Sequence, residues 1–127
     1  QDASEEAFRR MVFNVLAVNC DDHSKNFSFM LREGGKWELS PAYDLTHSYM
    51  PGNQWVSQHL SAVGGVFAGA GRNAMLELAD RFSIGRALKI IQQVEEAVHA
   101  WPDFAAIAKL PELETNAIGE QFKNRPV

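Results

Sequence analysis

Apolar side chains recur at three- and four-residue steps near the start of the chain, which is typical of an amphipathic helix. Ser4 is the expected N-cap, and two acidic residues follow it at the positive end of the helix dipole. We expect this helix to end near Val18. The polar run 19–26 then predicts a loop, because Asn, Asp and Ser side chains compete with a helix for backbone hydrogen bonds. The apolar stripe consists of Phe8, Met11, Val12, Val15 and Leu16.

A two-residue alternation replaces the helical pattern after this loop. Phe27, Phe29 and Leu31 alternate with Ser28 and Met30. Trp37 and Leu39 alternate again, and the Glu-Gly-Gly turn 33–35 lies between the two runs. This pattern predicts a β-hairpin with one buried face. Pro41 is expected to end it, because proline has no N–H for a strand ladder.

The rest of the chain is irregular at first and then helical. Residues 45–72 are rich in Gly, Ser, His and Asn and predict a long loop, whose part 61–72 is expected to be mobile. Helices are expected from residue 73 onward, and Pro102 suits the first turn of a short one. The pattern therefore predicts a single domain over 1–127, mainly α with one β-hairpin. The stripes and packing residues expected in this part are Met75, Leu78, Ala79 and Phe82; Leu88, Ile91, Val94 and Val98; Leu113, Ala117, Ile118 and Phe122; and Trp37, Trp55 and Trp101.

Composition narrows the class of protein without naming a function. Apolar residues make up 46% of the 127 residues and charged residues 22%, as in ordinary globular domains. The net charge of −4 and the absence of a basic stripe argue against direct nucleic-acid binding. The single Cys excludes a disulfide framework, and we expect a reducing, cytoplasmic location without membrane contact. The chain does not begin with Met, so we expect it to be part of a longer protein.

Three polar residues flank the predicted hairpin in the arrangement that a protein-kinase-type site uses. Asp21 and Asn26 precede the hairpin, and Asp44 follows it. A tight hairpin brings its two ends together, so Asn26 and Asp44 can meet one ion. In such sites the first Asp accepts the proton of the substrate hydroxyl, while the Asn and the second Asp hold Mg²⁺ on the nucleotide phosphates. No glycine-rich phosphate loop followed by a strand Lys is visible.

Each of these residues also has a plainer interpretation. Asp21 and its neighbour Asp22 are suited to capping local N–H groups, Asn26 to an Asx turn, and Asp44 to capping a turn. The three together favour the phosphoryl-transfer site. Two other assignments stay open: His23 and Lys25 bind phosphate or simply brace the loop and meet solvent, and Tyr43 lines a nucleotide pocket or packs on the hairpin. Cys20 is expected to be a packing residue. A transition-metal site of His47 and His59 with Asp21, Asp22, His23 and Asp44 is a weaker alternative, because its spacing matches no metal motif.

Two segments resemble the HipA-like serine/threonine kinases, the toxins of HipBA-type toxin–antitoxin pairs, which are linked to bacterial persistence. The family pattern is roughly N-x-D-x-H-x-K-N, then a hairpin, then L-x-P-x-Y-D. Similarity continues through most of the chain from about residue 7 to 108. The matching residues are Asn19, Asp21, His23, Lys25 and Asn26, then Leu39, Pro41, Tyr43 and Asp44.

The resemblance implies the helical C-terminal lobe of a protein-kinase-like fold. It implies that Asp21 is the catalytic base, that Asn26 and Asp44 bind Mg²⁺, and that His23, Ser24, Lys25, Asn26, Tyr43 and Asp44 face ATP. It also implies as partners an N-terminal ATP-gripping lobe, a protein substrate such as an aminoacyl-tRNA synthetase, and a helix-turn-helix antitoxin. The chain departs from many relatives at 61–66, where a motif like S-x-N-G-K is replaced and its lysine is missing.

Three functions follow from this sequence. The first is the catalytic-loop and Mg²⁺-binding part of a HipA-like kinase that transfers the γ-phosphate of ATP to a protein hydroxyl, and that is inactive without its other lobe. The second is a non-catalytic module, either a remnant or half of a split kinase, that docks a partner. The third, a metal-dependent phosphohydrolase, would need a further carboxylate or His cluster.

Overall fold

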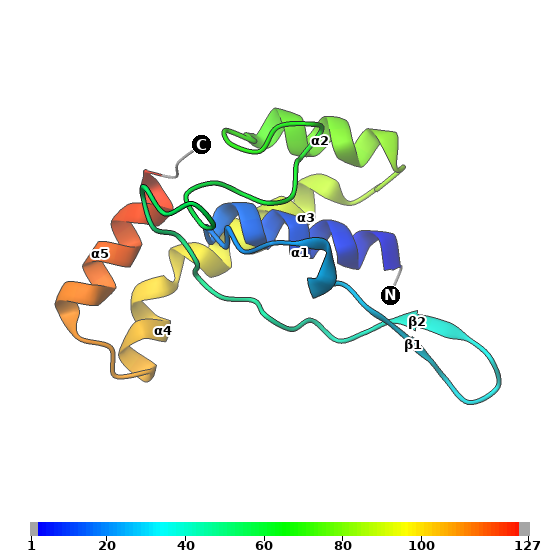
Figure 1. Cartoon of the computed structure of the whole chain (residues 1–127), viewed down its shortest axis with the longest axis horizontal. Helices are drawn as coiled ribbons and strands as arrows, with labels where there is room; N and C mark the ends of the chain where they lie inside the picture. Colours follow the sequence, from blue (N-terminus) through cyan, green and yellow to red (C-terminus); the bar gives the residue numbers. More distant parts are fainter. Residues whose placement is uncertain (1–2, 125–127) are drawn as a thin grey trace.

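Helices dominate the part of the chain that the structure, a computed structural model, describes, which is residues 3–124 (Figure 1). Five α-helices and a short 3₁₀ turn accompany one two-stranded antiparallel sheet in this range. The predicted class, mainly α with one β-hairpin, is therefore confirmed. The elements are α1 (Ala3–Leu16), η1 (Ser24–Asn26), β1 (Phe29–Leu31), β2 (Trp37–Leu39), α2 (Arg72–Arg81), α3 (Ala87–His99), α4 (Trp101–Ile107) and α5 (Glu112–Lys123).

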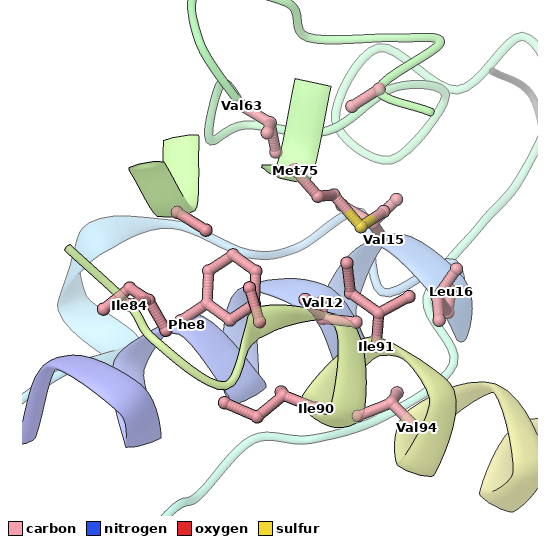
Figure 2. Packing of buried hydrophobic residues seen from close by; sticks show 13 residues of the cluster. Phe8, Val12, Val15, Leu16, Val63, Met75, Ile84, Ile90, Ile91 and Val94 are labelled. Atoms are coloured by element: carbon pink, nitrogen blue, oxygen red, sulfur yellow. The ribbon is translucent and has the colours of Figure 1, made fainter. Parts of the chain in front are cut away.

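The apolar stripe of α1 forms the centre of the core by packing against α3 (Figure 2). Phe8 and Val12 on α1 face Ile90 and Ile91 on α3, and Met75 on α2 closes the cluster from a third side. Burying a side chain of this size stabilises the fold by about 1.5–3 kcal/mol relative to leaving it in water. Helix α1, which leads into the polar run, is thus the most firmly held element.

Tertiary packing changes which face of each later helix is buried. Leu88 and Phe82 were expected in apolar stripes but are 62% and 63% exposed. Helix α3 instead turns Ala87 and Ile90 inward, because the position of α1 decides which face it meets. Helix α1 already includes Ala3, so the prediction that Ser4 is its N-cap is wrong.

The hairpin projects away from the helices, so the prediction that one of its faces is buried is wrong (Figure 1). Phe29 pairs with Leu39 and Leu31 with Trp37, which puts these four side chains on one face of the ribbon. Phe29, Leu31 and Trp37 are 56–65% exposed. Trp55 is likewise 65% exposed, so the expectation that it packs in the core is also wrong.

The base of the hairpin is held to α1 by a buried arginine. One terminal nitrogen of Arg10 (Nη2) donates to the carbonyl of Ser40 at 2.6 Å, and its Nε donates to Glu6 at 3.0 Å. The hydroxyl of Ser28 donates to that of Ser40 at 2.9 Å, which closes the ribbon at the same level. These bonds fix where the chain leaves the hairpin toward Asp44.

Replacing Ile91 by Ala is expected to lower the free energy of unfolding by about 2–5 kcal/mol, because its side chain is 1% exposed in the core. Leu88→Ala on the same helix is the matched control and is expected to stay within about 0.5 kcal/mol of the parent chain. Urea denaturation followed by circular dichroism measures both. Equal losses for the two variants would contradict the observed face of α3.

Candidate active site

The polar run begins where α1 stops, in a turn that no regular element continues. Val18 has a left-handed backbone with φ of 51°, which is unusual for a β-branched residue. Its carbonyl accepts the N–H of Ser48 at 3.1 Å, and the N–H of Cys20 donates back to the carbonyl of Ser48 at 2.9 Å. This isolated bridge anchors the start of the loop to the segment that follows Asp44.

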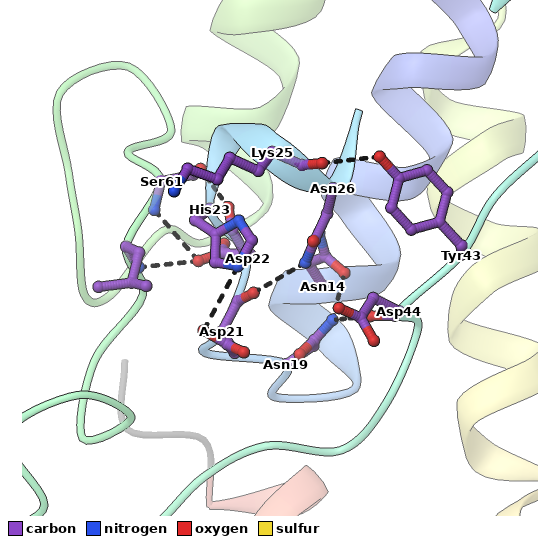
Figure 3. A network of polar contacts seen from close by, with 11 residues as sticks. Asn14, Asn19, Asp21, Asp22, His23, Lys25, Asn26, Tyr43, Asp44 and Ser61 are labelled. Carbon is purple, nitrogen blue, oxygen red and sulfur yellow. Dashed lines mark hydrogen bonds and ion pairs between the residues drawn. The ribbon is translucent and has the colours of Figure 1, made fainter. Parts of the chain in front are cut away.

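A buried amide joins the two halves of the predicted site (Figure 3). The Nδ2 of Asn19 donates to Asn14 Oδ1 at 3.0 Å and to the backbone carbonyl of Asp44 at 3.1 Å. Asn19 is 1% exposed and Asn14 is 5% exposed, so the bond between them is buried, while the bond to Asp44 is partly buried. Asp44 has φ of 57°, a left-handed conformation that Asp tolerates better than most residues. Asn19 therefore sets where Asp44 lies relative to the loop.

Asp22 is the buried carboxylate of the run, and its contacts are distant in sequence (Figure 3). Its oxygens accept from the Nδ1 of His59 at 2.9 Å and from the N–H groups of Leu60 and Ser61 at 2.8 and 3.1 Å. The hydroxyl of Ser61 donates to the backbone carbonyl of Asp22. The alternative in which Asp22 caps local N–H groups is therefore wrong, because the groups it caps lie 38 and 39 residues away.

Asp21 has a different environment from its neighbour. Its side chain is 49% exposed, and its Oδ1 lies 3.9 Å from the Nε2 of His23. Its backbone carbonyl accepts the Nδ2 of Asn26 at 3.0 Å. The Nδ1 of His23 is buried without a hydrogen-bond partner in residues 3–124. The loop thus presents the carboxylate of Asp21 to solvent beside an imidazole.

Tyr43, which follows the hairpin, contacts the 3₁₀ turn η1, which precedes it. The hydroxyl of Tyr43 donates to the backbone carbonyl of Lys25 at 2.7 Å, which ties the strand exit to the turn that ends at Asn26. Ser24, Lys25, Tyr43 and Asp44 are all exposed, and Asn26 is partly buried. The predicted site is therefore an open surface of the domain.

The donor set suits a hard cation. Because the Nδ2 of Asn26 donates to a carbonyl, its Oδ1 is the part of that amide left for another partner. The carboxylate of Asp44 forms no hydrogen bond or ion pair within residues 3–124. An amide oxygen and a carboxylate are ligands that Mg²⁺ accepts together with phosphate and water. Both residues are of a type that suits the predicted ion, although no hydrogen bond joins their side chains within residues 3–124.

The transition-metal alternative finds no support. Residues 3–124 contain no group of three or more His, Cys, Asp or Glu side chains placed to hold a metal ion. The ring nitrogens of His47 contact the carbonyl of Ala17 at 2.9 Å and Gln121 Oε1 at 2.6 Å. His59 contacts Asp22. Both histidines therefore have structural partners.

Sequence reasoning did not foresee the positioning role of four residues that hold this site together: Asn14, Asn19, Asp22 and Ser61. Asn14 offered a signal, because it lies four residues after Arg10 and is the one polar residue in the otherwise apolar run 11–16. Residues at this spacing share a face, so a polar partner for that face was predictable. The identity of the partner was not.

Cys20 is completely buried, as predicted for a packing residue. Burial raises the pKa of its thiol from 9.0 to about 11, and the nearby carboxylate of Asp22 adds to the rise. A thiol of this kind is a poor nucleophile at neutral pH. Cys20 therefore lacks the lowered pKa and the exposure of a reactive cysteine.

Comparison with known families identifies the chain. The profile of the HipA-like C-terminal domain matches residues 1–101 of the 127. The chain thus belongs to the HipA-like C-terminal domain family, a kinase family, as the two motifs predicted. Neither the curated proteins nor the solved structures gave a significant match. No helix of residues 3–124 has the length and apolar character needed to cross a membrane.

Cys20 is expected to react with Ellman's reagent at pH 8 at least about 100-fold more slowly in the native chain than in urea, because a pKa near 11 leaves about a hundredth of the thiolate that a pKa of 9.0 gives. The rate should rise with pH toward about 11. Since the unfolded thiol loses its proton first, the same shift makes the fold less stable as pH rises above about 9.

The measurement is unambiguous because the chain has a single Cys, and Cys20→Ser serves as the blank. Rapid labelling of the native protein at pH 8 would contradict the buried position.

Proposed function

We propose that this domain is the catalytic-loop and Mg²⁺-binding part of a serine/threonine protein kinase of the HipA type. The proposal rests on one observation above all: the amide of Asn19 bonds the backbone carbonyl of Asp44, and the amide of Asn26 bonds that of Asp21, so the exit of the hairpin is held against the polar loop (Figure 3). In protein kinases, the lobe that carries the catalytic loop supplies three such oxygen-bearing groups for phosphoryl transfer.

Asp21 is the residue we assign to the substrate hydroxyl. Its half-exposed carboxylate is within reach of a protein Ser or Thr that approaches from solvent, and its backbone is held by Asn26. A carboxylate in this role orients the hydroxyl and accepts its proton, and most of its effect comes from placement. His23, whose Nδ1 is orphaned, and Lys25, whose side chain is exposed, flank it on the side assigned to the phosphates.

Asn26 and Asp44 are the residues we assign to Mg²⁺. When bound, the ion neutralises phosphate charge on ATP as transfer proceeds. Asn26 presents its Oδ1 because its Nδ2 is engaged, and the carboxylate of Asp44 has no partner among residues 3–124. Ser24, Lys25 and Tyr43 complete the exposed surface that we assign to the nucleotide.

A second function, a partner-docking module, has its own supporting observation. Phe29, Leu31 and Trp37 form an exposed apolar face on the hairpin, whose first strand begins three residues after Asn26. A partner of any kind would bury this face, including an ATP-gripping lobe, a helix-turn-helix antitoxin or a substrate such as an aminoacyl-tRNA synthetase. The two functions differ in their need for Asp21 and Asp44: the kinase function requires both side chains, and the docking function requires neither.

Mn²⁺ with ATP is expected to broaden the amide NMR signals of Asn26 and Asp44 in this chain, because Mn²⁺ takes the ligands of Mg²⁺ and relaxes nearby protons. Binding should be weak, since no phosphate-gripping loop is present. Asp44→Ala is expected to lower the affinity at least about tenfold. Asp80→Asn, an exposed carboxylate on α2, is the control and should change nothing. Undiminished broadening in Asp44→Ala would contradict the metal assignment.

Phosphoryl transfer is expected once the chain is combined with an ATP-gripping lobe. Asp21→Asn should then lower kcat by about 10²–10⁴-fold, because the amide cannot accept the hydroxyl proton. Transfer of labelled γ-phosphate from ATP to a protein substrate measures this, with Asp80→Asn again as control. Full activity in the Asp21→Asn protein would remove Asp21 from the mechanism and leave the docking function.

A further inference from the structure

We infer that Asp22 is a positioning residue for the loop, and that residues 59–61 act through it on Asp21. This inference rests on the proposed function in so far as Asp21 is the reactive residue. Asp22, His59, Leu60 and Ser61 are called the Asp22 cluster below. Its members come from two segments without regular secondary structure, which lie 37–39 residues apart in sequence.

The Asp22 cluster bonds Asp22 at two places, its side-chain carboxylate and its backbone carbonyl. The carboxylate of Asp22 accepts three hydrogen bonds, from the ring of His59 and the N–H groups of Leu60 and Ser61. The backbone carbonyl of Asp22 accepts a fourth, from the hydroxyl of Ser61. Asp22 and His59 are 4% and 5% exposed. A residue bonded at its side chain and at its carbonyl has little freedom to rotate, so the peptide units on both sides of it are fixed.

Burial makes these bonds strong determinants of the loop. A buried carboxylate is stable as an anion only when donors surround it, and hydrogen bonds to a charged group contribute more than neutral ones. Removing one donor leaves the charge under-compensated, and the loop must then open to water. Residues 20–23 belong to no helix or strand. The backbone conformation of this segment is therefore fixed by the hydrogen bonds of the cluster.

The neighbours of Asp22 carry the effect to the proposed site. Asp21 precedes it and bonds Asn26 through its backbone carbonyl, and His23 follows it beside the carboxylate of Asp21. Figure 3 shows Asp22 and Ser61 on one side of the loop and Asp21 and Asn26 on the other. A shift of the Asp22 peptide would move Asp21 and Asn26 together. The 59–61 segment therefore sets the geometry of a site that it does not touch.

The test compares four variants of this chain by amide hydrogen exchange at residues 20–26. Asp22→Asn and Ser61→Ala each remove part of the cluster and are expected to speed exchange there by roughly 10- to 100-fold. Ser61→Thr keeps a hydroxyl donor and is expected to restore slow exchange. Val94→Ala, a core variant, loses global stability while leaving the loop intact.

A second readout uses Mn²⁺ with ATP on the same proteins. Ser61→Ala is expected to weaken the broadening at Asn26 and Asp44 at least about tenfold, and Ser61→Thr and Val94→Ala are expected to keep it. Unchanged exchange at residues 20–26 in Ser61→Ala would overturn the inference, and so would equal loosening in Val94→Ala. If Asp22→Asn does not fold, the Ser61 pair decides alone. Absence of any broadening in the parent chain would count against the proposed function, while the exchange data would still judge the Asp22 cluster.

Discussion

The need of buried polar groups for partners organises this domain around the end of α1. Asn14, Asn19 and Asp22 lie where the helix runs into the loop, and each is almost completely buried. A buried amide or carboxylate without a hydrogen bond costs several times what the bond itself contributes, so the chain must bring donors and acceptors to it. Asp44, Ser48 and residues 59–61 come to this place for that reason.

Two residues near these hydrogen bonds have unusual backbone conformations. Val18 and Asp44 both have positive φ, at 51° and 57°, and the bridge between Asn19 and Ser48 lies between them. Such conformations cost of order 1–3 kcal/mol each and persist only when their surroundings over-determine them. The bridge and the amide of Asn19 supply that determination. Strain at the two ends of the bridge places Asp44 opposite the loop.

Apolar packing and polar hydrogen bonding stabilise different parts of this domain. The α1–α3 core holds a helix in place, and the polar cluster at its end holds a loop on which the carboxylate of Asp21 is half exposed. Membership of the HipA-like C-terminal domain family agrees with this division, because a kinase lobe needs a firm base under an open catalytic loop. The apolar residues Phe29, Leu31 and Trp37 of the hairpin lie outside this core and are exposed.

The sequence alone was sufficient for the elements, the family and the candidate residues. Helical and two-residue periods are local properties, so α1, the hairpin and α4 were predictable, and the two motifs around Asp21 and Asp44 were specific enough to indicate the family. Their roles in catalysis and metal binding stay predictions. The buried face of each helix was less predictable. An apolar stripe such as that of Leu88 does not show which other element it packs against.

Tertiary structure alone decided which of two adjacent carboxylates is buried. Nothing local separates Asp21 from Asp22, and the difference arises because residues 59–61 fold back to bond only the second. The same holds for Asn19, whose partner Asp44 lies 25 residues away. Hydrogen bonds between distant segments leave no periodic signal in a single sequence, since a polar residue that finds a buried partner has the same letter as one that faces water.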